Sequence, residues 1–233
     1  MRYHGGKARV ARHLAPFIQE ALLKTRGRLL EPFVGGFNIV PALGHYARRV
    51  VCSDRNPGLI SLYRAVRGGW FPPAIDRELY YRLKAWGNWM NPATSFAAYG
   101  CSYAGKEWGG FAAGEERNYA AEARRALARK VSHMYKVTFL CRDYRDLAPR
   151  GNLWTIYCDP PYAGTTDYGI VFDSPRFHRW CEARAAEGHT VLVSELEAPR
   201  HWNVLWEAER PIYMARTAYA RKVERLYMAQ SQG

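Results

Sequence analysis

The sequence lacks the long apolar run that a membrane span requires. No stretch approaches the roughly 18 uninterrupted apolar residues of a transmembrane helix, and the first seven residues carry no apolar segment typical of a signal peptide. The five cysteines are odd in number and widely spaced, and no pair has the Cys-x-x-Cys spacing of a zinc site. We therefore expect a cytoplasmic protein with reduced thiols, no membrane association and no structural metal.

Acidic residues are few relative to basic ones. The chain has 34 Lys and Arg against 21 Asp and Glu, a formal net charge of +13 on 233 residues. Because a strongly positive potential attracts phosphate, nucleic acid is the leading candidate for a partner, with a merely basic surface as the alternative that charge alone leaves open. The 48% hydrophobic and 14% aromatic residues predict one globular domain with room for an insertion.

The first third of the chain alternates between helices and short strands. Apolar residues four apart indicate a helix over residues 7–24, which Pro16 is expected to kink or restart. Further segments alternate as strand 29–33, helix 39–46, strand 49–54 and helix 57–66. This order is typical of an α/β fold with a mostly parallel sheet, whose ligand lies at the carboxyl ends of the strands.

The pattern breaks near residue 70 and resumes near residue 136. The later segments are strands 137–141, 153–158 and 190–194, a helix over about 175–186, and a closing antiparallel hairpin of 212–218 with 222–228. We therefore predict a Rossmann-like core made of residues 1–69 and 136–233. Residues 70–135 form an inserted, mainly helical subdomain.

A glycine turn and an acid mark the first two strand ends. Gly35 and Gly36 follow a strand and open a helix, although the turn is not the Gly-x-Gly-x-x-Gly fingerprint of NAD or FAD sites. Asp54 ends the next strand, a position from which an acid accepts hydrogen bonds from ribose hydroxyls. The pair favours a nucleoside-bearing cofactor, while a simple turn or helix-capping role for Asp54 remains open.

The tetrapeptide Asp159-Pro160-Pro161-Tyr162 directly follows a buried strand. The two prolines fix the backbone and remove two N–H donors, so the Asp159 carboxylate and the carbonyl oxygens become rigid acceptors. Such acceptors suit the two hydrogens of an exocyclic amine, and Tyr162 could stack on the face of an extruded base. A strand-ending turn with a surface tyrosine is the alternative.

Together these segments resemble the Dam-like DNA adenine-N6 methyltransferases, particularly the short phage and prophage members. The matching pieces occur in the family's order and are Tyr3-His4-Gly5-Gly6-Lys7, Glu31-Pro32-Phe33-Val34-Gly35-Gly36, Ser53-Asp54-Arg55-Asn56 with Leu59, Ile60 and Tyr63, Asp143-Tyr144, Tyr157 to Tyr162, Val193-Ser194-Glu195 and Glu224-Arg225-Leu226-Tyr227. The resemblance implies S-adenosylmethionine (SAM) as the methyl donor and double-stranded DNA as the substrate. It also implies a bacterial setting, in which a restriction partner is one possibility.

The resemblance further implies a role for each matched position. Tyr3 and Lys7 would lie beside the cofactor and the active site, although a lysine after Gly-Gly is ordinarily solvated. The remaining cofactor contacts would be Phe33 and Gly35 at the methionine part, Asp54 at the ribose, Asp143 and Tyr144 at the cofactor's adenine, together with Gly36 and Asp159. Asp159 through Tyr162 would receive the target adenine. The catalytic set would be Lys7, Asp159, Pro160, Pro161 and Tyr162.

The insert departs from the family's pattern. Its loop over residues 99–114 is rich in glycine where the family has an Asn/Arg-rich target loop, so a GATC target does not carry over. We expect this loop to be mobile and the insert to contact DNA, with the basic stretch that follows it meeting phosphates. The candidate DNA-binding residues are Lys106, Trp108, Arg117, Arg124 and Arg125, the last two on a helix with Arg129.

Two other functions fit the same residues. The amine-acceptor chemistry would serve cytosine N4 or an RNA base equally, although Asp rather than Ser before Pro-Pro-Tyr favours adenine by resemblance. A DNA-binding protein with a decayed methyltransferase fold is the other alternative. The intact Asp159 tetrapeptide and Asp54 argue against decay.

Overall fold

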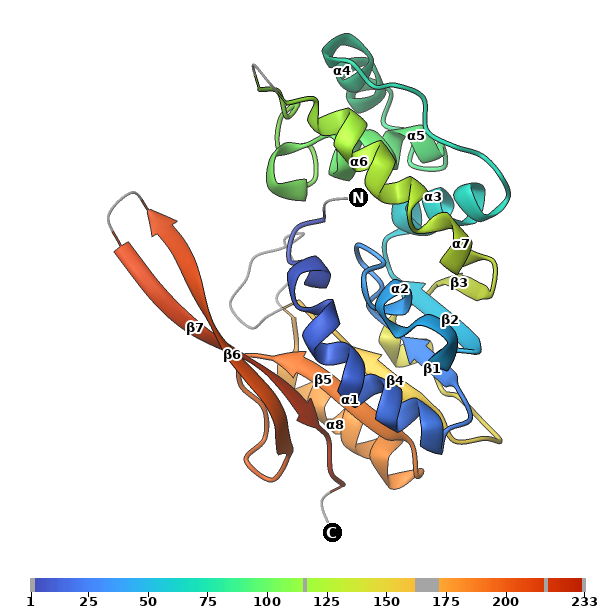
Figure 1. Cartoon of the computed structure of the whole chain (residues 1–233), viewed down its shortest axis with the longest axis vertical. Helices are drawn as coiled ribbons and strands as arrows, with labels where there is room; N and C mark the ends of the chain where they lie inside the picture. The colour runs from blue at the N-terminus through green and yellow to red at the C-terminus, as the bar shows by residue number, and fades with distance from the viewer. Residues whose placement is uncertain (1–2, 115–116, 162–171, 216–217, 232–233) are drawn as a thin grey trace.

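A seven-stranded sheet organises the structure (Figure 1). The structure is a computed structural model that describes residues 3–114, 117–161, 172–215 and 218–231, and for residues 210–222 it describes the backbone alone. The strand order is β3-β2-β1-β4-β5-β7-β6. Strands β3, β2, β1, β4 and β5 are parallel neighbours, and β7 runs antiparallel to both β5 and β6. The strands are β1 (Arg28–Glu31), β2 (Arg49–Asp54), β3 (Val137–Cys141), β4 (Thr155–Cys158), β5 (Thr190–Glu195), β6 (Asn203–Ala215) and β7 (Ala218–Met228).

The parallel strands β1, β4 and β5 lie at the centre of the sheet and are buried on both faces. All four residues of β4 are buried, and Leu29 and Leu30 of β1 are at most 3% exposed. Near-continuous apolar runs of this kind are what a sheet covered on both faces requires. The α/β Rossmann-like core predicted from the alternation is therefore confirmed.

Helices cover the two faces of the sheet. The helices α1 (Ala11–Lys24), α2 (Ile39–Leu43) and α3 (Pro57–Arg67) share one hydrophobic cluster with β2 and β3, while α8 (Ser174–Ala186) belongs to a second cluster behind β4 and β5. Short turns complete the core: η1 (Lys7–Arg9), η2 (Gly44–Tyr46) and η5 (Tyr144–Asp146). Among the described residues no helix is both long enough and apolar enough to traverse a bilayer.

The segment 70–135 is mainly helical and lies above the carboxyl ends of the strands, as Figure 1 shows. Its elements are α4 (Arg77–Trp86), α5 (Pro92–Ser95), the π-helical turn η3 (Phe96–Gly100), η4 (Tyr103–Gly105), α6 (Tyr119–Ala128) and α7 (Val131–Met134). Asp76, Asn91 and Asn118 cap α4, α5 and α6 by accepting backbone N–H groups. The segment contributes Tyr80, Phe96 and Leu127 to the same hydrophobic cluster as α1 and α3, so it packs on the core as part of one body.

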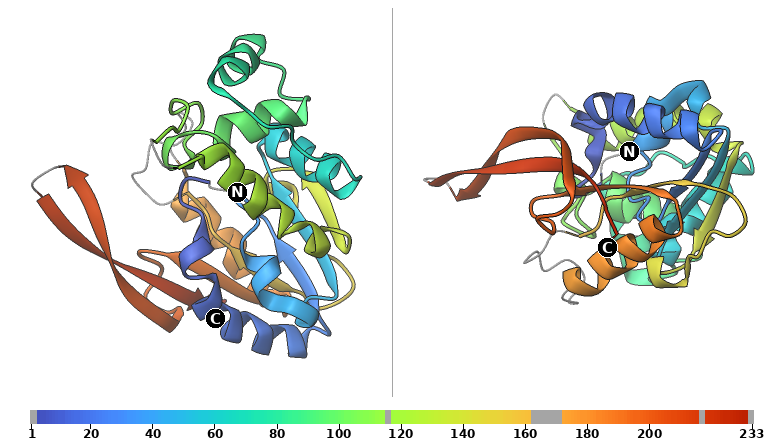
Figure 2. Two further views of the ribbon diagram at one scale, coloured as in Figure 1. Left: turned by 45° about the horizontal axis from the view of Figure 1, so that its top comes forward. Right: turned by 90° about the horizontal axis from the view of Figure 1, so that it is seen from below.

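The hairpin of β6 and β7 is longer than predicted. Strand β6 begins at Asn203 and runs through Pro211, which pairs with Arg221, whereas the sequence pattern placed its start after that proline. The missing N–H is tolerated because β6 is the outermost strand of the sheet. The two views in Figure 2 show the far half of this hairpin projecting away from the body.

Three local expectations differ from the structure. Helix α1 continues without interruption past Pro16. The predicted helix 39–46 changes to 3₁₀ geometry at Gly44, whose φ is +60°. Arg129 follows the end of α6 instead of lying within it, since the helix ends at Ala128.

Candidate active site

A cavity of about 680 Å³ opens at the carboxyl ends of β1, β2 and β4. The structure brings to it every predicted cofactor-binding residue and every predicted catalytic residue but one, Tyr162, which lies outside the described residues. The predicted residues that line the cavity are Tyr3, Lys7, Phe33, Gly35, Gly36, Asp54, Asp143, Tyr144, Asp159, Pro160 and Pro161. The sequence therefore predicted the location of the cavity, while the roles of these residues stay predictions.

The glycine turn is tied to Asp54. The Gly35 N–H donates to Asp54 Oδ2 and the Asn56 N–H to Asp54 Oδ1, each over 3.0 Å, so the acid holds the turn as well as facing the cavity. Gly35 has a φ of +42°, and a Cβ there would lie 3.1 Å from the Tyr3 ring. Burial raises the pKa of Asp54 although both backbone N–H groups favour its ionised form.

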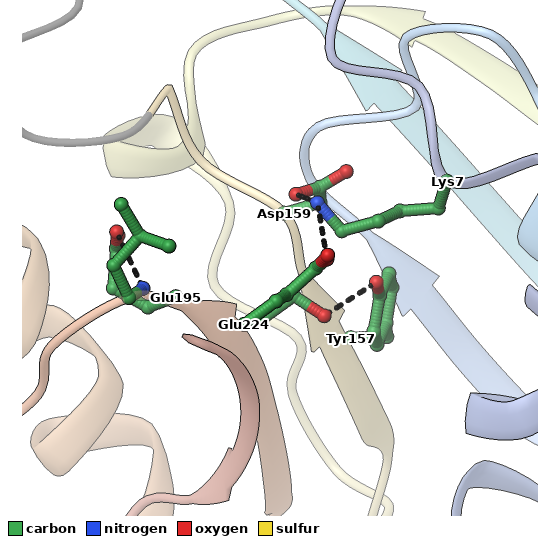
Figure 3. A network of polar contacts seen from close by, with 7 residues as sticks. Lys7, Tyr157, Asp159, Glu195 and Glu224 are labelled. Atoms are coloured by element: carbon green, nitrogen blue, oxygen red, sulfur yellow. Dashed lines mark hydrogen bonds and ion pairs between the residues drawn. The ribbon is translucent and has the colours of Figure 1, made fainter. Parts of the chain in front are cut away.

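Lys7 lines the cavity and is buried among carboxylates (Figure 3). Its ammonium contacts Asp159 Oδ1 and lies 3.3 Å from Glu224 Oε1, with Lys7 and Glu224 at most 3% exposed. The solvated alternative for Lys7 is therefore wrong. Since Asp159 comes from the end of β4 and Glu224 from β7, Lys7 joins two strands and holds the Asp159 carboxylate in place.

Two further carboxyl groups lie buried near Asp159. Burial raises the pKa of Glu31 and of Glu195 to about 8, and the charge of Asp159 acts in the same direction on both. Glu31 lines the cavity and accepts a hydrogen bond from the Cys52 thiol. Glu195 accepts the Leu196 N–H over 3.2 Å, and no described group hydrogen-bonds its second oxygen. The resemblance matched both glutamates but assigned neither a role.

Aromatic rings also line the cavity. Phe33 and Tyr144 have ring centroids 5.5 Å apart, and Phe172 lies 6.1 Å from Phe33 at an edge-to-face angle of 77°. Beside them Arg145 binds Asp143 through Nε to Oδ1 at 2.7 Å and Nη2 to Oδ2 at 3.1 Å. Burial opposes ionisation of Asp143, but these bonds outweigh it and lower its pKa. The cavity thus combines flat apolar rings with acidic side chains.

One wall of the cavity comes from the segment 70–135. Trp89, Tyr99 and Glu107 line it, and the Tyr99 hydroxyl donates to Glu107 Oε2 at 2.7 Å while accepting from Asn56 Nδ2 at 2.6 Å. Gly105 packs directly on Tyr3, where a Cβ would lie 2.7 Å from the Tyr3 backbone nitrogen. Sequence reasoning missed this wall, and it expected a mobile loop where the chain is instead folded against the amino-terminal segment.

The predicted DNA-binding residues are absent from the lining residues of the cavity. Lys106 and Arg125 are exposed, whereas Trp108 is half-buried between the rings of Tyr80 and Trp89. Arg124 donates to the Pro72 carbonyl and lies over Phe71. In addition, Arg117 pairs with Glu122. Packing explains Trp108 and part of Arg124, so Lys106 and Arg125 are the strongest of the five predictions.

Two comparisons bear on the family. The family model of D12 class N6 adenine-specific DNA methyltransferases matches residues 3–85. A curated relative, the Retron Ec67 DNA adenine methylase of Escherichia coli, is 27% identical over 198 residues, covering 72% of this chain and 68% of the relative. Both matches support the resemblance of this chain to the Dam-like DNA adenine methyltransferases. The predicted resemblance and the predicted enzyme class are thereby confirmed.

Solved structures similar to this methyltransferase are distant. A putative RNA methyltransferase, PH1948 from Pyrococcus horikoshii, is 10% identical with a TM-score of 0.45, covering 95% of this chain and 82% of its own. A putative methylase, HI0767 from Haemophilus influenzae, is 11% identical with a TM-score of 0.38, covering 96% and 89%. At these scores neither adds to the assignment.

SAM is the methyl donor of this methyltransferase family, and the cavity fits it. Gly36 cannot carry a side chain, since a Cβ there would lie 2.7 Å from Asn38 Nδ2. The carboxylates that line the cavity suit a sulfonium cation, and its aromatic rings suit a purine. No group of three or more His, Cys, Asp or Glu among the described residues is arranged to hold a metal ion.

Proposed function

We propose that this methyltransferase acts on the N6 amine of an adenine that has been flipped out of double-stranded DNA, within a short specific sequence. The observation that carries the proposal is that Asp159 and Pro160 line the same cavity as Asp54 and the glycine turn. A cofactor site and a rigid amine-acceptor site therefore share one space at the sheet edge. An adenine inside a duplex could not present its amine there, so the base must be extruded.

The chain's own residues supply positioning. The Asp159 carboxylate and the Pro160 carbonyl accept the two N6 hydrogens, which orients the nitrogen lone pair away from them. Lys7 and Glu224 hold the Asp159 carboxylate in one orientation. When bound, SAM supplies an electrophilic methyl group whose bond to sulfur breaks as the bond to N6 forms, and the surplus N6 proton passes to water.

We further propose that residues 70–135 form the target-recognition subdomain. The core residues account for cofactor and amine, and this segment both departs from the family pattern and exposes Lys106 and Arg125. Base contacts specify a sequence and phosphate contacts position the protein on it. The net charge of +13 supports an extended contact with the duplex.

The test is methylation of DNA from a host without adenine methylation, followed by digestion to nucleosides and mass spectrometry. We expect N6-methyladenine, and modified-base sequencing of the same DNA should show it in one short motif. Detection of N4-methylcytosine would show that the cytosine N4 amine is the target instead of adenine N6. Methylation of RNA alone would reject DNA as the substrate. The absence of any transferred methyl group would indicate a decayed enzyme.

A further inference from the structure

Lys130, a half-buried cation between α6 and α7, joins the segment 70–135 to the glycine turn. Its Nζ donates to the Gly36 carbonyl and to Asn38 Oδ1, each over 2.7 Å. Burial lowers the pKa of Lys130 to about 8, partly offset by the negative charge of Glu31. The amine loses hydrating water at this position, and two hydrogen bonds to the turn replace those that it made with water.

Both acceptors belong to the cavity, whereas Lys130 is not among its lining residues. Gly36 and Asn38 line the cavity, and Lys130 donates to both of them from outside the set of lining residues. A ligand in the cavity would therefore meet the same two residues that the segment 70–135 holds through Lys130. In this arrangement Gly36 and Asn38 face the ligand site, and Lys130 supports these two residues without lining the site.

Asn38 also lies against the amino-terminal segment, at Gly6. A Cβ at Gly36 would lie 2.7 Å from Asn38 Nδ2, and a Cβ at Gly6 would lie 3.0 Å from the same atom. The Asn38 amide therefore fills the space between the two glycines, with its oxygen held by Lys130. A shift of Lys130 would move the amide that spaces both glycine segments.

We propose that Lys130 is a positioning residue that holds Gly36 and Asn38 in the cofactor-binding arrangement and thereby couples DNA binding by residues 70–135 to cofactor binding. The inference rests on the proposed function for the identity of the two ligands. Coupling between two sites is a free energy and is reciprocal, so DNA must tighten the cofactor by the same factor by which the cofactor tightens DNA.

The experiment measures S-adenosylhomocysteine binding by calorimetry, without and with a saturating duplex that carries the methylated motif. In the wild type we expect at least fivefold tighter binding in the presence of duplex. In Lys130→Met we expect about tenfold weaker binding without duplex and a coupling factor below two. The variant Asn38→Ala should behave alike, and the double variant should be no weaker than either single variant, because the three groups act as one unit.

A matched control is Lys136→Met. Lys136 Nζ also donates to a glycine carbonyl, that of Gly44, over 2.8 Å, but neither residue lines the cavity. This variant should lose a similar hydrogen bond while keeping the wild-type affinity and coupling. A merely structural role for Lys130 would lower the stability of both variants and leave the coupling factor unchanged.

The outcomes separate the two proposals. Lys130→Met within twofold of the wild type in both affinity and coupling would overturn the inference, as would a wild type that shows no coupling. A wild type that binds neither S-adenosylhomocysteine nor duplex would instead reject the proposed function. Should Lys130→Met fail to fold, the affinity and coupling factor of Asn38→Ala are compared with those of the wild type. This substitution removes only the amide that Lys130 holds.

Discussion

Charge is handled in opposite ways by the sheet edge and by the segment 70–135. At the sheet edge Lys7 and Glu224 are at most 3% exposed and pair with each other. In the segment, Lys106 and Arg125 are exposed. Buried charges need fixed partners and therefore define geometry, whereas exposed ones serve a flexible anionic partner at little structural cost. The difference suggests chemistry at the sheet edge and attraction in the segment.

The largest expected effect is at Asp159. Replacing Asp159 by Ala removes the amine acceptor, so we expect methyl transfer to fall by about 1000-fold or more, roughly 4 kcal/mol of transition-state stabilisation. DNA binding should stay within about threefold of the wild type in a filter-binding assay. The control is Asp146→Ala, which removes an exposed carboxylate near the same edge. Residual activity within about tenfold of the wild type would refute the role of Asp159.

The next effect concerns stability at Lys7. Replacing Lys7 by Met leaves Glu224 buried without its ammonium partner, which we expect to cost about 3–5 kcal/mol of unfolding free energy. Urea unfolding at neutral pH measures this loss. Adding Glu224→Gln to Lys7→Met should recover part of it, because the uncompensated charge is then removed. A double variant less stable than Lys7→Met would show that Glu224 is stabilised by something other than Lys7.

Asp54 separates cofactor affinity from catalysis. The variant Asp54→Asn keeps one acceptor oxygen for the turn but loses the charge, so we expect SAM binding to weaken by about tenfold, roughly 1.4 kcal/mol. The rate at saturating SAM should change little. Calorimetry in the presence of a chelator measures the affinity and also tests the expected independence from metal. Unchanged affinity would exclude Asp54 from the ribose site.

Glu195 should make stability depend on pH. Its pKa is raised to about 8 in the folded protein, so between about 4.5 and 8 the folded state binds more protons than the unfolded state. Its contribution is therefore fully present below pH 4.5 and is lost as pH rises through 8. The difference in unfolding free energy between the wild type and Glu195→Gln should follow this window. Glu197→Gln removes an exposed carboxylate two residues away and should show no such difference.

The smallest effects are expected on the exposed cations. Replacing Arg125 by Gln should weaken binding to every duplex by about threefold and lower the salt slope by about one. Replacing Lys106 should instead change which sites are methylated, if it reaches a base edge, with about 1–3 kcal/mol of discrimination at stake. Modified-base sequencing beside salt-titrated binding distinguishes the two. If no substitution within 70–135 alters the methylated motif, recognition belongs elsewhere, with the β6–β7 hairpin as the next candidate.

Local patterns predicted those parts of the molecule that local forces determine. Strand β3 was placed at its observed bounds, and the Asp159 motif and Asp54 were placed at one sheet edge, because strand ends and proline turns leave marks in a few adjacent residues. The contacts of Lys7 with Glu224 and of Tyr99 with Asn56 were not predicted. They join segments far apart along the chain, and nothing adjacent to either partner indicates the other.

The hairpin shows how a local signal misleads. Pro211 was interpreted as a strand boundary because proline interrupts a hydrogen-bonded ladder. In the outermost strand, however, its missing N–H has no neighbouring strand to bind on that side. The position of the strand in the sheet decides whether a proline ends the strand or is tolerated within it, and the proline itself does not encode that position. The same holds for Trp108, whose loop position suggested DNA contact and whose neighbours instead give it a packing role.

The meeting of Lys7, Asp159 and Glu224 also has a consequence during synthesis. Lys7 is synthesised long before Glu224, and both must be present before the ammonium is enclosed. Contacts of such long sequence separation form late and slowly. A nascent chain that has folded its first four parallel strands still lacks β7. We therefore expect nascent chains that end before β7 to leave Lys7 without its Glu224 partner.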